Sequence, residues 1–526
     1  AALEPRSGEA GDALQQLTGL DSAFLYLETP ETPMHVASLH LYDLPDGFRG
    51  DFAKAVRSHL RSRLHLLPVL RRRLAPLPLQ VASPVWVEDR RVDLARHVRR
   101  ATLPAPGTLA QLHEWVARAH AETLDRTRPL WEFWAIDGLG SGQVALYCKV
   151  HHATLDGAAG VALVTEMLDT TPRPRQAARP SKRGATGPAG QAGTRAVLGT
   201  AFEHTAAQFV KLVRSLPAVL PLLAGMVAGV RSKAGRSGLA LLGRNFAFGP
   251  RTPWSGAIGR ERSVATVSMP LDEVKAIARA RDATVNDVVL AICSGALRRY
   301  LAAHGGVPKK PLVAAVPVSL RAAGDLGYDT QATMVPASLA THLADPVRRL
   351  RAIRDAAGAS KSLTSSARNV LPTDFPTLGL PWLLSALASL YGRTRLANAI
   401  PPIANLVISN VPGPQVPLYL AGARMRTYWP LSIVEHGLGL NITVESYSGS
   451  LDFGLVACRR SIPDLEVLAA AMTDAFGELR ATGRRKHATP TGTARGGARK
   501  MTAPAATRQA TQRQPARSRP AKREGD

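Results

Sequence analysis

The chain has 526 residues, 45% of them hydrophobic, which is enough for two to four domains with complete apolar cores. Its formal net charge is +26, and its three cysteines, Cys148, Cys293 and Cys458, are far apart and form no CxxC pair. These features argue against a disulfide-stapled fold and a thiolate zinc site, and the acidic N-terminus has no apolar signal segment. We therefore expect two large domains in a reducing compartment.

The positive charge is concentrated in two segments. Residues 481–526 hold twelve Lys or Arg against two acids, and residues 171–195 hold six basic residues and no acid. The first segment is rich in Ala, Pro, Gln and Thr and cannot bury enough apolar surface to fold, so a disordered basic tail is expected. Such a tail either attracts anionic lipid or nucleic acid, or is only solvated. Because no nucleic-acid module is visible, we predict no specific nucleic-acid partner.

The N-terminal part predicts alternating helices and strands. The stripe of Phe52, Val56, Leu60 and Leu64 has helical spacing. The expected elements are a short helix, a turn and a strand within 17–45, helices at 51–64 and 108–124, a strand at 142–150, and a helix that starts at Asp156.

A linker rich in Pro, Gly and Arg follows at 171–195. The longest uncharged runs beyond it are too short or too rich in proline to span a bilayer, which needs about 20 helical residues. The segments 205–232 and 380–397 either lie in a membrane interface, with flanking arginines at the headgroups, or are ordinary buried helices.

From residue 260 the alternation of strands and helices begins again, which predicts a second α/β module. Two such modules would form one cleft between them, a usual place for a ligand site. The expected elements are a strand at 262–270, helices at 271–281 and 284–301, a strand at 311–320, a helical region from 344, strands within 430–456, and a helix at 463–481.

Two adjacent histidines, His151 and His152, lie between a predicted strand and a predicted helix. A neutral imidazole accepts a proton well near pH 7, so a histidine here suits a general base. No G-x-S-x-G elbow is present and no cysteine has a reactive setting, so the nucleophile is expected to belong to the substrate. Adjacent side chains at a strand end point to opposite sides, so only one of the two faces a given cleft. From composition alone, two structural histidines explain the pattern equally well.

Asp156 follows the histidines by four residues and either orients the base or caps the next helix; the spacing favours capping. Gly157 lets the backbone turn and approach closely. The spacing of the histidines and Asp156 matches no established zinc pattern, so we predict no metal site.

The segment "HHATLDG" at 151–157 resembles the HHxxxDG motif of CoA-dependent acyltransferases. Further segments narrow the resemblance to the bacterial wax ester synthase/acyl-CoA:diacylglycerol acyltransferase family and run in family order over about residues 14–480. They are "LTGLDSAFLYLETPETPMHV" (17–36), "LPVLRRRL" (67–74), "RPLWEFWAIDGL" (128–139), "TVNDVVLAICSGALRRYL" (284–301), "ISNVPGP" (408–414) and "PLSIVEHGLGLNITVESYSGSLDFGLV" (430–456).

The resemblance implies an α/β (α+β) fold of two chloramphenicol-acetyltransferase-like domains with an active-site tunnel between them. It implies His152 as the general base, His151 as its support, and a mainly structural Asp156. The expected organisation is a flexible N-terminus at 1–13, an N-terminal acyltransferase domain at 14–170, a linker at 171–255, a C-terminal acyltransferase domain at 256–480 and a basic tail at 481–526.

The oxyanion donor is not evident from the sequence. Asn286 is a candidate because it lies in the family's "ND" motif, but Thr284 and Asp287 have the spacing of a capping box, so this motif equally suits a helix start. Asn410, Pro412 and Gly413 either shape the tunnel or form a rigid turn.

The leading hypothesis is transfer of a long-chain acyl group from acyl-CoA, a substrate and not a cofactor, to diacylglycerol. The near alternative is wax ester synthesis on a long-chain alcohol, and the alternative of a different class is a lipid-binding protein without catalysis. No cofactor is predicted. Because acceptor and product are apolar, we expect a cytoplasmic protein held peripherally at the inner membrane or at lipid bodies.

Overall fold

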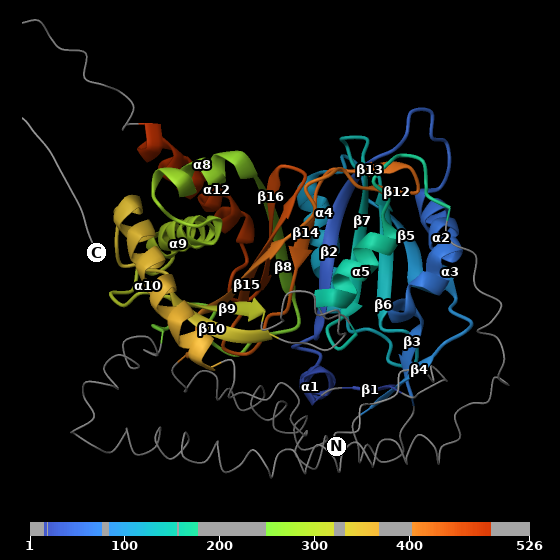
Figure 1. Ribbon diagram of the computed structural model, residues 1–526, viewed down its shortest axis with the longest axis horizontal. Helices are drawn as coiled ribbons and strands as arrows, with labels where there is room; N and C mark the ends of the chain where they lie inside the picture. Colours follow the sequence, from blue (N-terminus) through green and yellow to red (C-terminus); the bar gives the residue numbers. More distant parts are fainter. Residues whose placement is uncertain are drawn as a thin grey trace, which may run out of the picture.

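Two mixed α/β modules lie side by side in the computed structural model (Figure 1). The structure describes residues 15–17, 19–75, 84–154, 157–176, 249–319, 332–367 and 402–484. Several predictions fall outside these residues: the flexible N-terminus 1–13, the segments 205–232 and 380–397, Asp156, and the tail beyond residue 484.

A seven-stranded sheet forms the N-terminal module, in the order β12-β13-β2-β7-β6-β5 with β14 also paired to β2. All pairs are antiparallel except β5 with β6. Its strands are β2 (His35–Asp43), β5 (Val98–Thr102), β6 (Trp131–Asp137), β7 (Val144–His151), β12 (Tyr419–Leu420), β13 (Ala423–Met425) and β14 (Trp429–Leu431).

Helices cover both faces of this sheet. One face packs on α2, α3 and α5, and the other packs on α4, which also contacts β8 of the second module. Asp51 starts α2 by accepting the Lys54 N–H, and a capping box of Thr108 and Gln111 starts α4. The helices are α1 (Gly19–Leu27), α2 (Phe52–Arg63), α3 (Leu94–His97), α4 (Leu109–Ala121) and α5 (Gly157–Met167).

A small three-stranded sheet lies beside this module, in the order β1-β4-β3. Two short 3₁₀ helices lead into it from α2. The elements are η1 (Leu64–Leu66), η2 (Pro68–Arg71), β1 (Gln15–Gln16), β3 (Arg72–Leu74) and β4 (Val85–Glu88).

The C-terminal module is a six-stranded sheet in the order β10-β9-β11-β15-β16-β8. Its helices α8, α9, α10 and α12 pack with one face of the sheet into the largest apolar core among the described residues. The elements are β8 (Arg262–Pro270), α8 (Leu271–Ala280), α9 (Val285–Ala303), β9 (Val313–Ser319), β10 (Ala332–Ser338), α10 (Pro346–Ala367), β11 (Leu406–Pro412), β15 (Leu440–Tyr447), β16 (Ser450–Cys458) and α12 (Leu465–Arg484).

Part of the N-terminal sheet is built from the C-terminal part of the chain. Strands β12, β13 and β14 come from the C-terminal part of the sequence but complete the N-terminal sheet beside β2. Asp169, just after α5, forms a backbone bridge with Tyr419 of β12, with N–H to carbonyl distances of 2.8 and 2.7 Å. The N-terminal sheet is therefore complete only when residues 419–431 are present.

The mixed α/β character predicted from the sequence is confirmed, and the predicted helices and strands within the described residues form at the expected places. The expected strand at 142–150 is β7, and the expected helix at 284–301 is α9. Among the helices described, none is both long and apolar enough to cross a bilayer.

Candidate active site

The two histidines follow one another at the end of β7. His151 is the last residue of the strand and is fully buried, and His152 begins the turn toward α5. Neighbouring segments hold both peptide groups: the His151 N–H donates to the Leu130 carbonyl at 2.9 Å, and the His152 N–H donates to the Met34 carbonyl at 2.9 Å. The backbone of the pair is thus tied to two other parts of the N-terminal module.

The His151 ring is held in one orientation. Its Nδ1 accepts a hydrogen bond from the Ala153 N–H at 3.1 Å, so the proton of the neutral ring lies on Nε2. That Nε2 lies 3.5 Å from Oε1 of Glu28, whose side chain is 4% exposed. This distance is long for a hydrogen bond, but it puts a carboxylate beside the ring nitrogen that carries the proton. His151 therefore faces a buried acid and not open solvent.

The His152 ring stacks on Phe24, with ring centroids 4.0 Å apart and an interplanar angle of 22°. Its Nδ1 is buried and has no hydrogen-bond partner among the residues described. Burial, with a smaller contribution from His151, lowers the pKa of His152 to about 4. The imidazole is thus neutral at pH 7, which is the state that a general base requires.

The "ND" motif starts α9. Asp287 is buried and accepts hydrogen bonds from the Thr284 N–H and hydroxyl, both at 2.8 Å, while its own N–H donates to Thr284 Oγ1 at 3.2 Å. This capping box gives Asp287 a structural role at the helix start. The neighbouring Asn286 accepts a hydrogen bond from Asn410 Nδ2 at 3.3 Å. Two candidates that are 124 residues apart therefore meet between α9 and β11.

Asn410 and Pro412 belong to β11, and Gly413 follows its end. A Cβ at Gly413 would lie 2.5 Å from the Ser446 carbonyl oxygen and 2.7 Å from Glu445 Oε1, so the close approach of β15 requires glycine here. Burial and the nearby Asp452 raise the pKa of Glu445 to about 8, so this carboxyl holds its proton at neutral pH.

Of the remaining candidates, Gly157 is the first residue of α5, whereas Asp156 lies outside the described residues. The two roles considered for Asp156, capping and orientation of the base, therefore stay predictions. All three cysteines are buried, and burial raises the pKa of Cys148 and Cys293, which keeps both thiols protonated.

Comparison with known families identifies the family to which the chain belongs. Residues 17–289 match the family described as the wax ester synthase/diacylglycerol acyltransferase catalytic domain, and residues 330–480 match its C-terminal domain. The chain belongs to this family.

Two relatives and two solved structures illustrate the match. A Mycobacterium tuberculosis protein provisionally named a diacylglycerol O-acyltransferase is 39% identical over 467 residues, which are 88% of this chain and 99% of that protein. A probable diacylglycerol O-acyltransferase of the same organism is 35% identical over 477 residues, 87% and 97% of the two chains.

The wax ester synthase/diacylglycerol acyltransferase of Marinobacter aquaeolei VT8 matches in structure with a TM-score of 0.63 and 29% identity, over 89% of this chain and 100% of that chain. The first condensation domain of the calcium-dependent antibiotic synthetase matches with a TM-score of 0.51 and 16% identity, over 89% and 97% of the chains, and shows the fold alone. These matches confirm the two-module fold and the family that the sequence predicts.

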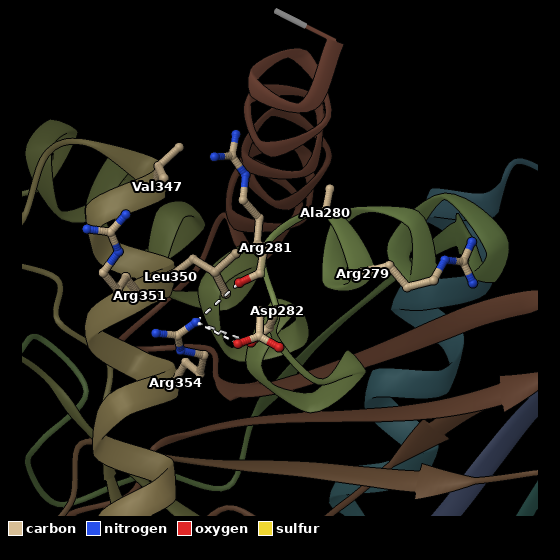
Figure 2. A pocket seen from close by; sticks show the side chains of 8 residues that line it. All are labelled: Arg279, Ala280, Arg281, Asp282, Val347, Leu350, Arg351 and Arg354. Atoms are coloured by element: carbon tan, nitrogen blue, oxygen red, sulfur yellow. Dashed lines mark hydrogen bonds and ion pairs between the residues drawn. The ribbon is translucent and has the colours of Figure 1, made fainter. Parts of the chain in front are cut away.

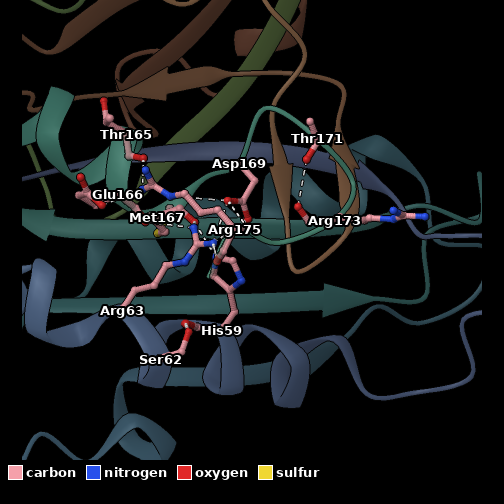
Figure 3. A network of polar contacts seen from close by, with 10 residues as sticks. All are labelled: His59, Ser62, Arg63, Thr165, Glu166, Met167, Asp169, Thr171, Arg173 and Arg175. Carbon is pink, nitrogen blue, oxygen red and sulfur yellow. Dashed lines mark hydrogen bonds and ion pairs between the residues drawn. The ribbon is translucent and has the colours of Figure 1, made fainter. Parts of the chain in front are cut away.

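In this acyltransferase, a second network holds the far end of α5 (Figure 3). Arg63 Nη2 donates to both carboxylate oxygens of Asp169, at 2.8 and 3.0 Å, and the two side chains are 1% and 3% exposed. Arg63 Nη1 also donates to the Glu166 carbonyl at 3.2 Å, in the last turn of α5. Because Gly157 begins α5, this buried pair anchors the helix that follows the histidine motif.

Sequence reasoning about the acyltransferase missed three residues beside the histidines: Phe24, Glu28 and Arg126. Arg126 Nη2 donates to Glu28 Oε2 at 2.8 Å. No spacing signal marks these contacts, because Glu28 and Arg126 are 98 residues apart. Phe24 and Glu28 lie in the segment 17–36 that resembles the family, and this resemblance was the sequence feature that pointed to them.

Two hollows in the described residues each belong to one module. One of about 260 Å³ lies between the end of α8 and α10, and one of about 360 Å³ lies beside β6 and the end of α4. In the first, Arg279 and Arg351 point apart, and Arg354 turns toward Asp282 (Figure 2). Neither hollow is lined by both modules, so neither is the predicted tunnel, which stays a prediction.

Proposed function

We propose that this enzyme transfers a long-chain acyl group from acyl-CoA to the free hydroxyl of diacylglycerol, forming triacylglycerol, with His152 as the general base. The observation that carries the proposal is the state of His152: a neutral, partly buried imidazole stacked on Phe24 at a corner whose backbone is fixed. The names of the mycobacterial relatives support diacylglycerol as the acceptor.

The proposed reaction needs no protein nucleophile. His152 takes the proton from the acceptor hydroxyl as the oxygen attacks the thioester carbonyl, which gives a tetrahedral intermediate and an imidazolium. When the intermediate collapses, the C–S bond breaks and the imidazolium returns the proton to the CoA sulfur. The amide groups of Asn286 and Asn410 are the candidates to stabilise the oxyanion.

The test is thiol release from palmitoyl-CoA by the purified protein with dioleoylglycerol, hexadecanol or no acceptor. We expect acceptor-dependent release that falls by about 10² or more in His152→Ala. His342→Ala, which removes an exposed histidine of the C-terminal module, is the matched control and should keep wild-type activity. If folded wild-type protein releases thiol at the same rate with either acceptor and without acceptor, the proposal is contradicted.

The same assay separates the alternatives. Faster release with hexadecanol than with dioleoylglycerol would favour wax ester synthesis. A non-catalytic lipid-binding protein would associate with lipid equally well before and after His152→Ala and would release no thiol in either form.

We further propose that the enzyme binds membranes or lipid bodies peripherally, because its proposed acceptor and product are apolar and its net charge is +26. Sedimentation with vesicles containing phosphatidylglycerol measures this. We expect high salt or carbonate to release part of the protein, and deletion of residues 485–526 to weaken binding at low salt. Binding that resists both treatments completely would argue against a peripheral attachment.

A further inference from the structure

We propose that Glu28 is the positioning residue of this active site: one buried carboxylate that fixes the His151 ring directly and the His152 backbone through Met34. The inference rests on the proposed role of His152 as the base.

The first link is the contact with His151. Because the His151 Nδ1 accepts the Ala153 N–H, the ring proton lies on Nε2, and this atom faces Glu28 Oε1 at 3.5 Å. No other hydrogen-bond partner for Nε2 is found in the described part of the chain. The carboxylate therefore favours one tautomer and one ring orientation of His151, as neighbouring acids do for other functional histidines.

The second link runs through Met34. Glu28 Oε1 accepts the Met34 N–H at 3.1 Å, and the carbonyl of the same Met34 accepts the His152 N–H at 2.9 Å. The carboxylate thus anchors the residue that holds the backbone of His152. Phe24, one helical turn before Glu28, stacks on the His152 ring. The end of α1 consequently touches both histidines.

The third link keeps Glu28 charged and in place. Arg126 donates to Glu28 Oε2 through Nη2 at 2.8 Å and through Nε at 3.2 Å, and it also donates to the Leu25 carbonyl at 2.6 Å. Burial alone would raise the pKa of Glu28, but contacts with His151 and Arg126 outweigh it and lower the pKa to about 2. The carboxylate is therefore ionised throughout the range in which the enzyme is expected to work.

Glu28→Gln is the decisive variant. The amide keeps the shape and one acceptor but loses the charge, and Arg126, whose side chain is 43% exposed, can turn to solvent. Glu31→Gln is the matched control, because it breaks an ion pair with Arg260 three residues along the same segment and touches neither histidine. Melting curves of both variants show whether the fold is kept.

We expect kcat with palmitoyl-CoA and dioleoylglycerol to fall about 10- to 100-fold in Glu28→Gln, with KM within about twofold of wild type. Because Arg126 acts through Glu28, Arg126→Gln should cost less, and the double variant should be no slower than Glu28→Gln alone. A kcat of Glu28→Gln within twofold of Glu31→Gln would overturn the inference.

A second measurement does not depend on activity. Hydrogen exchange of the peptide that contains residues 150–154 should be faster in Glu28→Gln than in wild type and unchanged in Glu31→Gln, because a neutral amide holds the Met34 N–H, and through it the His152 backbone, more weakly than the carboxylate does. If the wild type releases no acceptor-dependent thiol, the proposed function fails, and this exchange result alone decides whether Glu28 holds the histidine corner. Unchanged exchange would then reject the positioning role.

Discussion

The two modules differ in what they bury. Seven histidines are buried among the described residues, and all of them lie in the N-terminal module. The core of the C-terminal module is built from aliphatic and aromatic side chains on α8, α9, α12 and the sheet. The seven histidines are His35, His40, His59, His97, His113, His120 and His151.

The difference shows how a module can bury many polar rings by giving them hydrogen-bond partners. Most of these rings bond to backbone carbonyls or hydroxyls: His35 to the His120 carbonyl at 2.8 Å and His120 to the Tyr147 hydroxyl at 2.8 Å, for example. A neutral imidazole with a partner costs far less to bury than an ammonium or carboxylate. The N-terminal module is therefore polar inside but sensitive to acid, and the C-terminal module supplies a conventional apolar core.

The largest expected loss of stability comes from breaking the buried ion pair of the N-terminal module. Asp169→Ala leaves the Arg63 guanidinium buried without its carboxylate and should cost about 3–5 kcal/mol in the free energy of unfolding. Chemical denaturation measures this. Asp137→Ala removes the partner of Arg100, which is 55% exposed, and should cost much less because solvent screens this pair. Equal losses of unfolding free energy in Asp169→Ala and Asp137→Ala would show that burial of the ion pair makes no difference.

A cavity in the C-terminal core should be costly but functionally silent. Leu455 is fully buried in this core, so Leu455→Ala should cost about 2–5 kcal/mol in the free energy of unfolding. The kcat of the molecules that stay folded should match wild type, because the histidines lie in the other module. A large loss of kcat at temperatures where the variant is folded would show that this core shapes the site.

Acid sensitivity should be traceable to single histidines. Burial lowers the pKa of His113 to about 4, whereas a histidine in an unfolded chain has a pKa of about 6.5. The unfolded state therefore gains the proton first, and the stability that His113 provides above pH 6.5 is lost as the pH falls toward 4. Between pH 7 and 5 this amounts to about 2 kcal/mol.

Denaturation at several pH values checks this. In His113→Gln, the drop in unfolding free energy between pH 7 and 5 should be smaller than in wild type by that amount. His342→Gln, at an exposed position, should leave the pH dependence unchanged. An identical slope in wild type and His113→Gln would show that the ring takes up a proton as readily in the folded protein as in the unfolded chain.

The smallest expected effect is at the start of α9. Thr284→Ala removes the hydroxyl that accepts the Asp287 N–H and should cost about 1 kcal/mol. Denaturation at neutral pH measures it. Activity should fall little if the bond between Asn286 and Asn410 survives; a fall in kcat larger than the loss of stability would connect this helix start to catalysis.

Local patterns predicted the elements well where the pattern is long. The periodic apolar stripe of α2 and the capping box of α9 each specify their structure within one segment. Strands β12 to β14 have two or three residues each, too few for any periodicity, and β13 and β14 pair with β2, which is almost 400 positions earlier. Their place in the N-terminal sheet was not predictable from one sequence.

The residues of the candidate site also differ in how far the sequence alone could predict them. The histidine corner was visible because its residues are adjacent, and the position of Gly157 at a helix start followed from the sequence. Glu28, Arg126 and the bond between Asn286 and Asn410 depend on contacts between distant segments, which spacing does not encode. Only the resemblance to a family pointed to the segment that contains Glu28.

The contribution of β12 to β14 to the N-terminal sheet predicts how a fragment of this enzyme would behave. A fragment that ends before residue 249 would contain the histidines, but without β12 to β14 the strand β2 would lie open at the edge of its sheet. Unpaired edges recruit other chains, so such a fragment should self-associate when expressed alone. Co-expression with residues 249–526 should instead give a complex with one copy of each fragment, which sedimentation would detect. The two halves would then be complementary parts of a single folding unit.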